Sequence, residues 1–264
     1  MKQLVLAIAL SASPALASSV PEDLAGSDVL FLGEIHDNPE HHARQAGITA
    51  SVAPAALVFE MLTEEQAAAA LPELMSNEEA LATALGWAET GWPDFAMYYP
   101  IFAAAPGARI YGAGVPREAA RAAMVEGVAA WFGAEDAARF GLDRPLPDDE
   151  QAEQEALQMA AHCDALPEEM LPVMVDIQRL RDAALARAAA MALEETGGPV
   201  VVIAGNGHAR ADGGAPVYLA RAVPGARIAS FGQSEDGRLG GDFDASADSP
   251  AVAREDPCAA FAKE

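Results

Sequence analysis

The stretch Gly33–His42 reads GEIHDNPEHH and holds three of the five histidines of the chain. The apolar run Asp28–Leu32 before it is rich in strand formers. A helical pattern follows from Asn38-Pro39, where Asn is a favourable cap and Pro suits the first turn. The stretch therefore predicts a strand-to-helix turn with several titratable side chains. Such groups are costly to bury without partners, so they usually serve a site.

A second turn of the same kind lies far downstream. The apolar run Pro199–Ala204 ends in Gly205–His208, which reads GNGH. Both turns have the pattern G-x-x-H at the end of a predicted buried strand. One such turn is a weak signal, whereas two turns on separate strands predict a shared site.

Five apolar runs have the length and composition of strands, at residues 28–33, 55–60, 108–115, 199–204 and 226–231. Helical patterns separate them, which predicts an α/β fold with a mostly parallel sheet of about five strands, covered by helices on both faces. A helical insert, at about residues 116–196, lies between strands three and four. From about residue 232 to 264, Gly, Asp, Ser and Pro dominate and predict an irregular tail.

The first residues, 1–17, have the pattern of a secretory signal peptide. Lys2 gives a positive start, Leu4–Leu10 is apolar, and Ala15-Leu16-Ala17 fits the cleavage motif. We expect cleavage near Ala17, a single α/β domain over residues 18–264, and a periplasmic protein. An uncleaved membrane anchor is the alternative, but the apolar run is too short to span a bilayer comfortably. No other stretch approaches that length, so we expect no membrane span in the mature chain.

Charge and cysteine content restrict the partners and the compartment. The net charge of −24 at pH 7 argues against nucleic acids and anionic membrane surfaces as partners, because both would be repelled. Cys163 and Cys258 are the only cysteines. In an exported protein an even pair favours a disulfide, here one that holds the tail against the body, with two free thiols or a metal pair as alternatives.

Polar side chains follow the predicted strands at their carboxyl ends, where ligands bind in open α/β sheets. The first strand delivers Glu34 and His36, the second Glu60, the third Arg117, and the fourth His208. Two histidines and two carboxylates in one crevice can bind a divalent metal or perform acid–base chemistry. Glu60 also has an ordinary interpretation as a cap of the next helix.

An aromatic cluster is the other distinctive feature: Trp87, Trp92, Phe95, Tyr98, Tyr99 and Phe102. Most such clusters are core. The alternative is a wall for a flat hydrophobic ligand, with Tyr98 or Tyr99 offering a phenolate, an accepted axial ligand of haem iron. Arg181 offers a guanidinium to an anionic group or to a local salt bridge. The mature chain lacks C-x-x-C-H, which excludes covalent c-type haem.

The joint order of these motifs, from about residue 28 to 222, resembles the ChaN family of haem-binding uptake proteins. The matching pieces are GEIHDN at 33–38 with His41-His42, FEM at 59–61, GWP at 91–93 with YYP at 98–100, QRLRD at 178–182, and GNGH at 205–208. The resemblance implies an α/β sheet, haem or another small molecule as ligand, and a role in haem or iron acquisition. It also implies that haem can be enclosed between two subunits, and hence a homodimer. Candidate cofactor-binding residues are His41, His42, Tyr98, Tyr99 and Arg181. The chain lacks the lipid-attachment cysteine found in many ChaN proteins.

ChaN proteins are grouped with Tiki and TraB proteins and resemble erythromycin esterases, which implies an alternative function as a metal-dependent esterase or peptidase. In that enzyme His36, Glu60 and His208 hold the metal and Glu34 is the general base for its bound water. In a version without metal, which the resemblance to esterases suggests, His36 is the base. Binding of a ligand and turnover of a substrate both remain open at this point.

Overall fold

The computed structural model describes residues 21–256 and 258–259, so the predicted signal peptide at residues 1–17 lies outside it. The chain forms a sheet with the strand order β3-β2-β4-β1-β5-β6, and all neighbouring strands are parallel. The strands are β1 Val29–Glu34, β2 Ala56–Phe59, β3 Arg109–Gly112, β4 Val200–Gly205, β5 Ile228–Glu235 and β6 Ala245–Ser249. The predicted α/β fold is confirmed, with six strands in place of about five.

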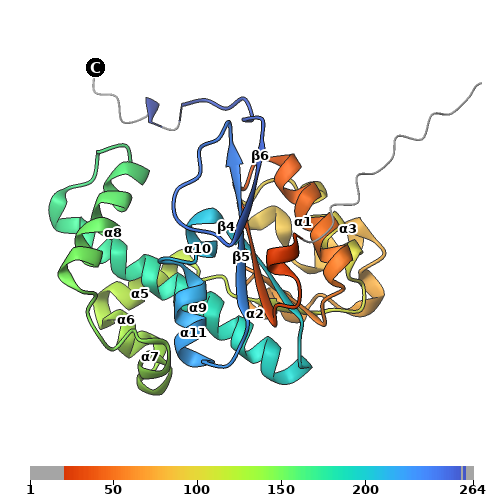
Figure 1. The fold of residues 1–264 in the computed structure, drawn as a ribbon, viewed down its shortest axis with the longest axis horizontal. Coiled ribbons are helices and arrows are strands. Elements are labelled where there is room, and N and C mark those ends of the chain that lie inside the picture. The colour runs from red at the N-terminus through yellow and green to blue at the C-terminus, as the bar shows by residue number, and fades with distance from the viewer. Residues whose placement is uncertain (1–20, 257, 260–264) are drawn as a thin grey trace, which may run out of the picture.

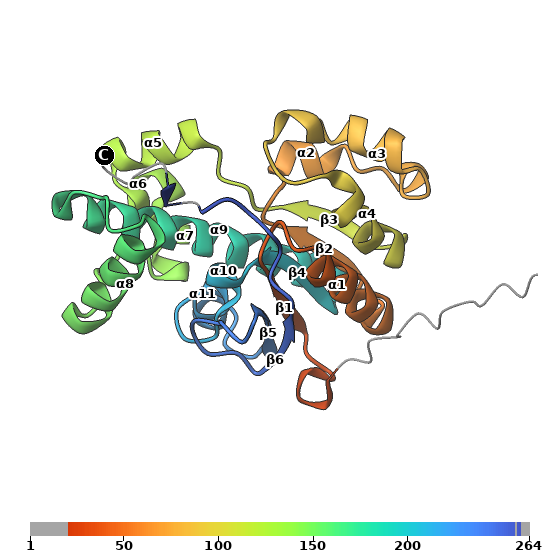
Figure 2. The same ribbon diagram turned by 90° about the horizontal axis from the view of Figure 1, so that it is seen from above.

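Helices cover both faces of the sheet (Figure 1). One face carries α1 Pro39–Val52, α2 Glu64–Ala68, α3 Glu78–Ala84 and α4 Phe95–Ala104. The other side carries α5 Arg117–Glu126, α6 Val128–Phe132, α7 Ala134–Phe140, α8 Asp148–Ala161, α9 Leu171–Thr196, α10 Asn206–Ala209 and α11 Ala215–Ala222. Short 3₁₀ turns lie at Glu22–Leu24, Pro72–Leu74, Trp87–Glu89 and Glu168–Met170. Figure 2 shows α5 to α8 gathered at one end of the molecule, as expected of the helical insert.

Alternate residues of each strand enter two separate cores, because successive side chains of an extended backbone point to opposite faces. Val29 and Phe31 pack with α9 and α11, whereas Leu30 and Leu32 pack with α1 and α4. The alanine-rich α9 lies against the sheet with Ala183, Ala186 and Ala189 fully buried. Small side chains there let the helix approach the strands closely. No helix in the described part of the chain has the length and apolar character that a membrane span requires.

The turn after β1 has the local structure that its sequence predicts. Asn38 is the cap of α1 and accepts a hydrogen bond from the Glu40 backbone N–H at 3.0 Å, and Pro39 occupies the first turn. After β2, Thr63 and Gln66 form the capping box of α2. Both strands end at the same edge of the sheet because each pairs in parallel with β4.

The C-terminal segment differs from the expected irregular tail. Residues Ala245–Ser249 form β6, which pairs with β5 from Phe231↔Ala245 to Glu235↔Ser249. This strand alternates alanine with polar residues and lies at the edge of the sheet, so it lacks the apolar run that marks the inner strands. Beyond it the chain crosses to the helical insert, where Cys163 and Cys258 form the predicted disulfide with Cα atoms 5.4 Å apart.

Candidate functional site

Glu34, the last residue of β1, is a buried carboxylate surrounded by donors. Its Oε1 accepts a hydrogen bond from the Tyr98 hydroxyl at 2.8 Å and lies 2.7 Å from Nδ1 of His36. Nδ1 of His42 lies 3.5 Å from the other carboxylate oxygen. Glu34 itself is 1% exposed. The histidine of the first G-x-x-H turn, His36, thus contacts the glutamate of the same turn, Glu34.

The surroundings of Glu34 keep its carboxyl ionised. Burial raises the pKa of this group, but the hydrogen bond from His36, the charges of His42 and His36 and the hydrogen bond from Tyr98 together lower it below its ordinary value. A buried carboxylate with a lowered pKa and two bound donors is a poor general base. This geometry does not favour the hydrolase alternative. Glu34 instead orients the imidazole of His36.

His36 is the exposed member of this group, with a side chain 34% accessible. Its ring lies against that of Trp92, with centroids 4.8 Å apart. A Cβ on Gly205 would lie 3.0 Å from Nε2 of His36, so the glycine of the second G-x-x-H turn leaves room for this ring. Burial lowers the pKa of His36, but the Glu34 hydrogen bond and the charges of Glu60 and Glu34 outweigh it and raise the net pKa.

His208 lies between two carboxylates. Nδ1 is 2.6 Å from Oδ1 of Asp182, and Nε2 is 3.5 Å from Oε1 of Glu60. The other oxygen of Glu60 accepts a hydrogen bond from the Gly205 backbone N–H at 2.7 Å. Burial lowers the pKa of His208, but the charges of Glu60 and Asp182 and the hydrogen bond to Asp182 raise it to about 9. The two carboxylates therefore favour the protonated form of His208.

The strand ends, α9 and the α2–α4 region enclose a cleft of about 580 Å³. Its apolar lining includes Trp92, Met61 and Leu185. Its charged lining consists of two glutamates, Glu60 and Glu89, and two arginines, Arg117 and Arg181. Within the part of the chain that the structure describes, neither guanidinium forms a hydrogen bond or an ion pair, so both are available to an anionic ligand.

The structure brings together four of the residues predicted from the strand ends. Glu34 contacts His36, and Glu60 lies near His208 and influences His36. Over residues 21–256 and 258–259, however, no group of three His, Cys, Asp or Glu side chains is arranged to hold a metal ion. Glu60 is already engaged with His208 and the Gly205 N–H, so the predicted metal set His36, Glu60 and His208 gains no support.

Most of the residues expected to bind a cofactor lie away from the cleft. His41 is buried, accepts from the Ile35 N–H at 2.9 Å and lies 2.8 Å from the Ser249 hydroxyl, so it joins the turn to β6. His42 is buried against Tyr98, with ring centroids 4.2 Å apart. Their contacts are structural, and neither residue lines the cleft.

Tyr98 and Tyr99 also point elsewhere. Tyr98 is fully buried, and burial together with Glu34 raises the pKa of its phenol. Tyr99 donates to the Met75 carbonyl at 3.4 Å. Of the five cofactor-binding candidates, Arg181 alone lines the cleft. Asp182, which holds His208, was missed as a site residue; its only signal was its position next to Arg181 in the QRLRD motif.

Comparison with known proteins agrees with this fold. The pattern of the family described as haem-binding uptake, Tiki superfamily, ChaN, matches residues 20–219. The chain is similar to ChaN of Campylobacter jejuni, solved with cofacial haem, with a TM-score of 0.60 and 20% identity over 84% of this chain and 87% of that one. The type III effector HopBA1 has a TM-score of 0.40 and 14% identity over 80% of this chain and 79% of that one. No curated protein matches the chain.

The fold therefore defines an α/β protein with a cleft at the carboxyl ends of β2 and β3. The chain belongs to the ChaN family of haem-binding uptake proteins, in the Tiki superfamily, and the resemblance inferred from its motifs is confirmed.

Proposed function

We propose that the cleft at the carboxyl end of the sheet binds haem and that the protein serves haem or iron acquisition outside the cytoplasm. Family membership supports the ligand class. The observation that carries the proposal is the cleft of about 580 Å³, which combines an indole wall with two unpaired guanidiniums. Its volume falls in the range of roughly 300–1,000 Å³ that is usual for small-molecule sites.

The residues present fit a flat apolar macrocycle with two carboxylates. Trp92 and Leu185 offer apolar surface, while Arg117 and Arg181 offer charge-assisted hydrogen bonds to the propionates. His36 is the accessible histidine beside the cleft, because it contacts Trp92 and is one-third exposed. Haem iron accepts an axial histidine. The carboxylate of Glu34 at Nδ1 orients the ring and leaves Nε2 for the metal.

Haemin titration of the purified mature protein tests this proposal. A Soret band should saturate at a defined stoichiometry. His36→Ala should shift the band and weaken binding, whereas His162→Ala, which removes a histidine of the helical insert, should change neither. Arg117→Gln with Arg181→Gln should weaken binding and leave the band position unchanged. Binding that does not saturate, or that is the same in all these variants, would contradict the proposal.

Export and dimerisation form part of the same proposal. The predicted signal peptide supports a periplasmic location, and the Cys163–Cys258 disulfide is compatible with it. Cell fractionation and N-terminal sequencing of the mature protein test this, with cleavage expected near Ala17. Helix α5 begins beside the cleft and exposes Val125, which is 87% accessible. Light scattering with and without haemin tests for a homodimer, which Val125→Glu should weaken.

A further inference from the structure

A second cavity, of about 350 Å³, lies between α7, the loop of residues 141–147, α9 and α11. Four arginines line it: Arg139, Arg144, Arg179 and Arg221. No Asp or Glu is among its lining residues, all of which lie in the described part of the chain. The chain as a whole has 40 acidic and 16 basic residues. The lining of this cavity thus carries four guanidiniums and no carboxylate. An adjoining cavity shares Arg179 and Arg221 with it and is also lined by Glu150, Glu153, Asp182 and Asp212.

This cavity is separate from the haem cleft. Arg179 and Arg181 are two positions apart on α9, and residues so spaced point to nearly opposite sides of a helix, about 200° apart. Arg181 accordingly lines the cleft and Arg179 lines the arginine cavity. The two sets of lining residues have no member in common.

Arg179 is only 6% exposed and forms hydrogen bonds with the loop that makes one wall of the cavity. Its Nη2 donates to the carbonyl oxygens of Gly141 and Arg144, at 3.2 and 2.7 Å, and its Nη1 pairs with Oδ1 of Asp176 at 3.4 Å. Gly141 has a φ of +81°, and a Cβ there would lie 2.7 Å from Nη1 of Arg221. The Gly141 carbonyl thus accepts a hydrogen bond from Arg179, and the lack of a side chain at Gly141 leaves space for the guanidinium of Arg221.

The donors of the other arginines are largely free. Arg139 and Arg221 form no ion pair with any described residue, and each lies over an aromatic ring, of Phe140 at 5.4 Å and of Tyr218 at 5.6 Å. Arg144 has a carboxylate no nearer than that of Asp143, at 3.7 Å. Like charges that converge on one cavity repel one another, and an anion between them would remove that cost.

We propose that the arginine cavity binds a small ligand that carries a diphosphate or a pair of phosphate groups. The planar fork of arginine matches phosphate oxygens bidentately. A phosphate monoester carries about −1.5 to −2 charges at neutral pH, against −1 for a carboxylate, so two phosphates balance several guanidiniums in little space. The volume of the cavity exceeds that needed by a lone ion and suits a small molecule.

Isothermal titration calorimetry with pyrophosphate at low ionic strength tests the proposal on the purified mature protein. We expect saturable binding at one site per chain. Arg139→Gln and Arg221→Gln should each weaken it about tenfold, because each removes charge-assisted hydrogen bonds. Arg121→Gln removes the same charge from an exposed position on α5 and should leave the affinity unchanged. Arg179→Gln is avoided, because Arg179 holds the 141–147 loop, and thermal melts should show that the variants used are folded.

Two further titrations distinguish binding in this cavity from binding in the haem cleft and from general attraction of anions. Arg181→Gln alters the haem cleft and should not affect pyrophosphate binding; an effect of Arg181→Gln without an effect of Arg221→Gln would place the anion in the cleft and overturn the proposal. Citrate should bind more weakly than pyrophosphate, and the reverse order would overturn the phosphate assignment. Absence of saturable pyrophosphate binding would overturn the site itself.

Discussion

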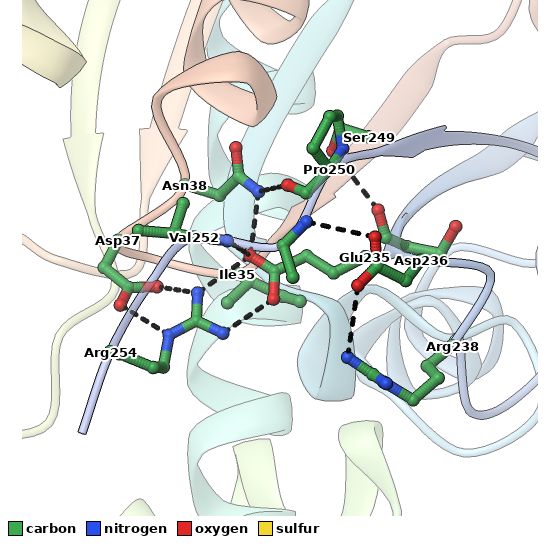
Figure 3. A network of polar contacts seen from close by, with 12 residues as sticks. Ile35, Asp37, Asn38, Glu235, Asp236, Arg238, Ser249, Pro250, Val252 and Arg254 are labelled. Carbon is green, nitrogen blue, oxygen red and sulfur yellow. Dashed lines mark hydrogen bonds and ion pairs between the residues drawn. The ribbon is translucent and has the colours of Figure 1, made fainter. Parts of the chain in front are cut away.

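Arg254 donates hydrogen bonds to both carboxylate oxygens of Glu235, at 2.6 and 2.7 Å (Figure 3). The same guanidinium donates to both oxygens of Asp37, at 2.8 and 2.7 Å. Asn38 Nδ2 also donates to Glu235 and to the Pro250 carbonyl. The segment after β6 is therefore bound both to β5 and to the turn that follows His36, and its polar contacts help to position that turn.

Arg254→Gln should destabilise the protein at neutral pH and reduce its sensitivity to acid. Hydrogen bonds from Arg254 lower the pKa of Glu235 from 4.5 to about 2. A lowered folded-state pKa contributes stability above pH 4.5 that is lost as the pH falls through about 2. Loss of the donor to this buried carboxylate should cost about 1–3 kcal/mol. Denaturant melts between neutral and acid pH measure both effects.

Arg238→Gln is the control for this variant, because Arg238 is exposed and its nearest carboxylate, that of Asp236, is 3.8 Å away. It should leave the melts almost unchanged. Equal stability of the Arg254 and Arg238 variants at neutral pH would mean that the C-terminal segment is not held by the ion pair.

Removal of the Cys163–Cys258 bond should lower the free energy of unfolding by about 2–4 kcal/mol. The bond joins residues 95 positions apart, so it restricts a long loop of the unfolded chain. Thermal melts of Cys163→Ser with Cys258→Ser, compared with wild type, measure the loss. Reductant should lower the melting temperature of the wild type to that of the double variant and leave the variant unaffected. A reductant effect of the same size on both would assign it to something other than this bond.

His208→Gln should remove a loss of stability that the wild type shows at alkaline pH. The pKa of His208 is raised from 6.5 to about 9 in the folded chain. A raised folded-state pKa contributes stability that is fully present below pH 6.5 and disappears as the pH rises through about 9. Urea melts over that pH range should decline for the wild type and for His162→Gln but stay flat for His208→Gln. Parallel declines in all three proteins would show that His208 is not an imidazolium between Glu60 and Asp182.

The parts of the site that sequence could predict are those fixed by strand geometry. The carboxyl ends of parallel strands lie at one edge of the sheet. The convergence of Glu34, His36, Glu60 and His208 could therefore be predicted once the strands that precede them were recognised. The contact of Asp182 with His208 depends instead on how α9 crosses the sheet, and no local sequence pattern reveals that crossing. The same holds for the arginine cavity, whose four side chains come from three helices and a loop.

Some differences between sequence and structure have simple physical causes. His208 was expected at the end of the fourth strand, but it lies on the short helix Asn206–Ala209. The Asn206 side chain hydrogen-bonds to the backbone N–H and carbonyl of Gln233. The family resemblance assigns His41 and His42 to a ligand, yet both find hydrogen-bond partners within the turn and β6. Buried polar groups satisfied by backbone atoms cannot be distinguished from ligand-binding groups in a single sequence.

Gly205→Ala should weaken haemin binding with little effect on stability. The backbone of Gly205 has a φ of −58°, which alanine adopts without strain, so the effect of the new methyl group is local. That group would lie 3.0 Å from Nε2 of His36, closer than an ordinary contact, and would displace the imidazole. If His36 holds the haem iron, its displacement should lower the affinity for haemin about tenfold, or about 1.4 kcal/mol. Gly207→Ala is the matched control, because a Cβ at position 207 meets no atom within 4 Å. Haemin titrations of the two variants, with thermal melts alongside, should separate them; equal affinities would show that the approach of His36 to Gly205 does not position the haem ligand.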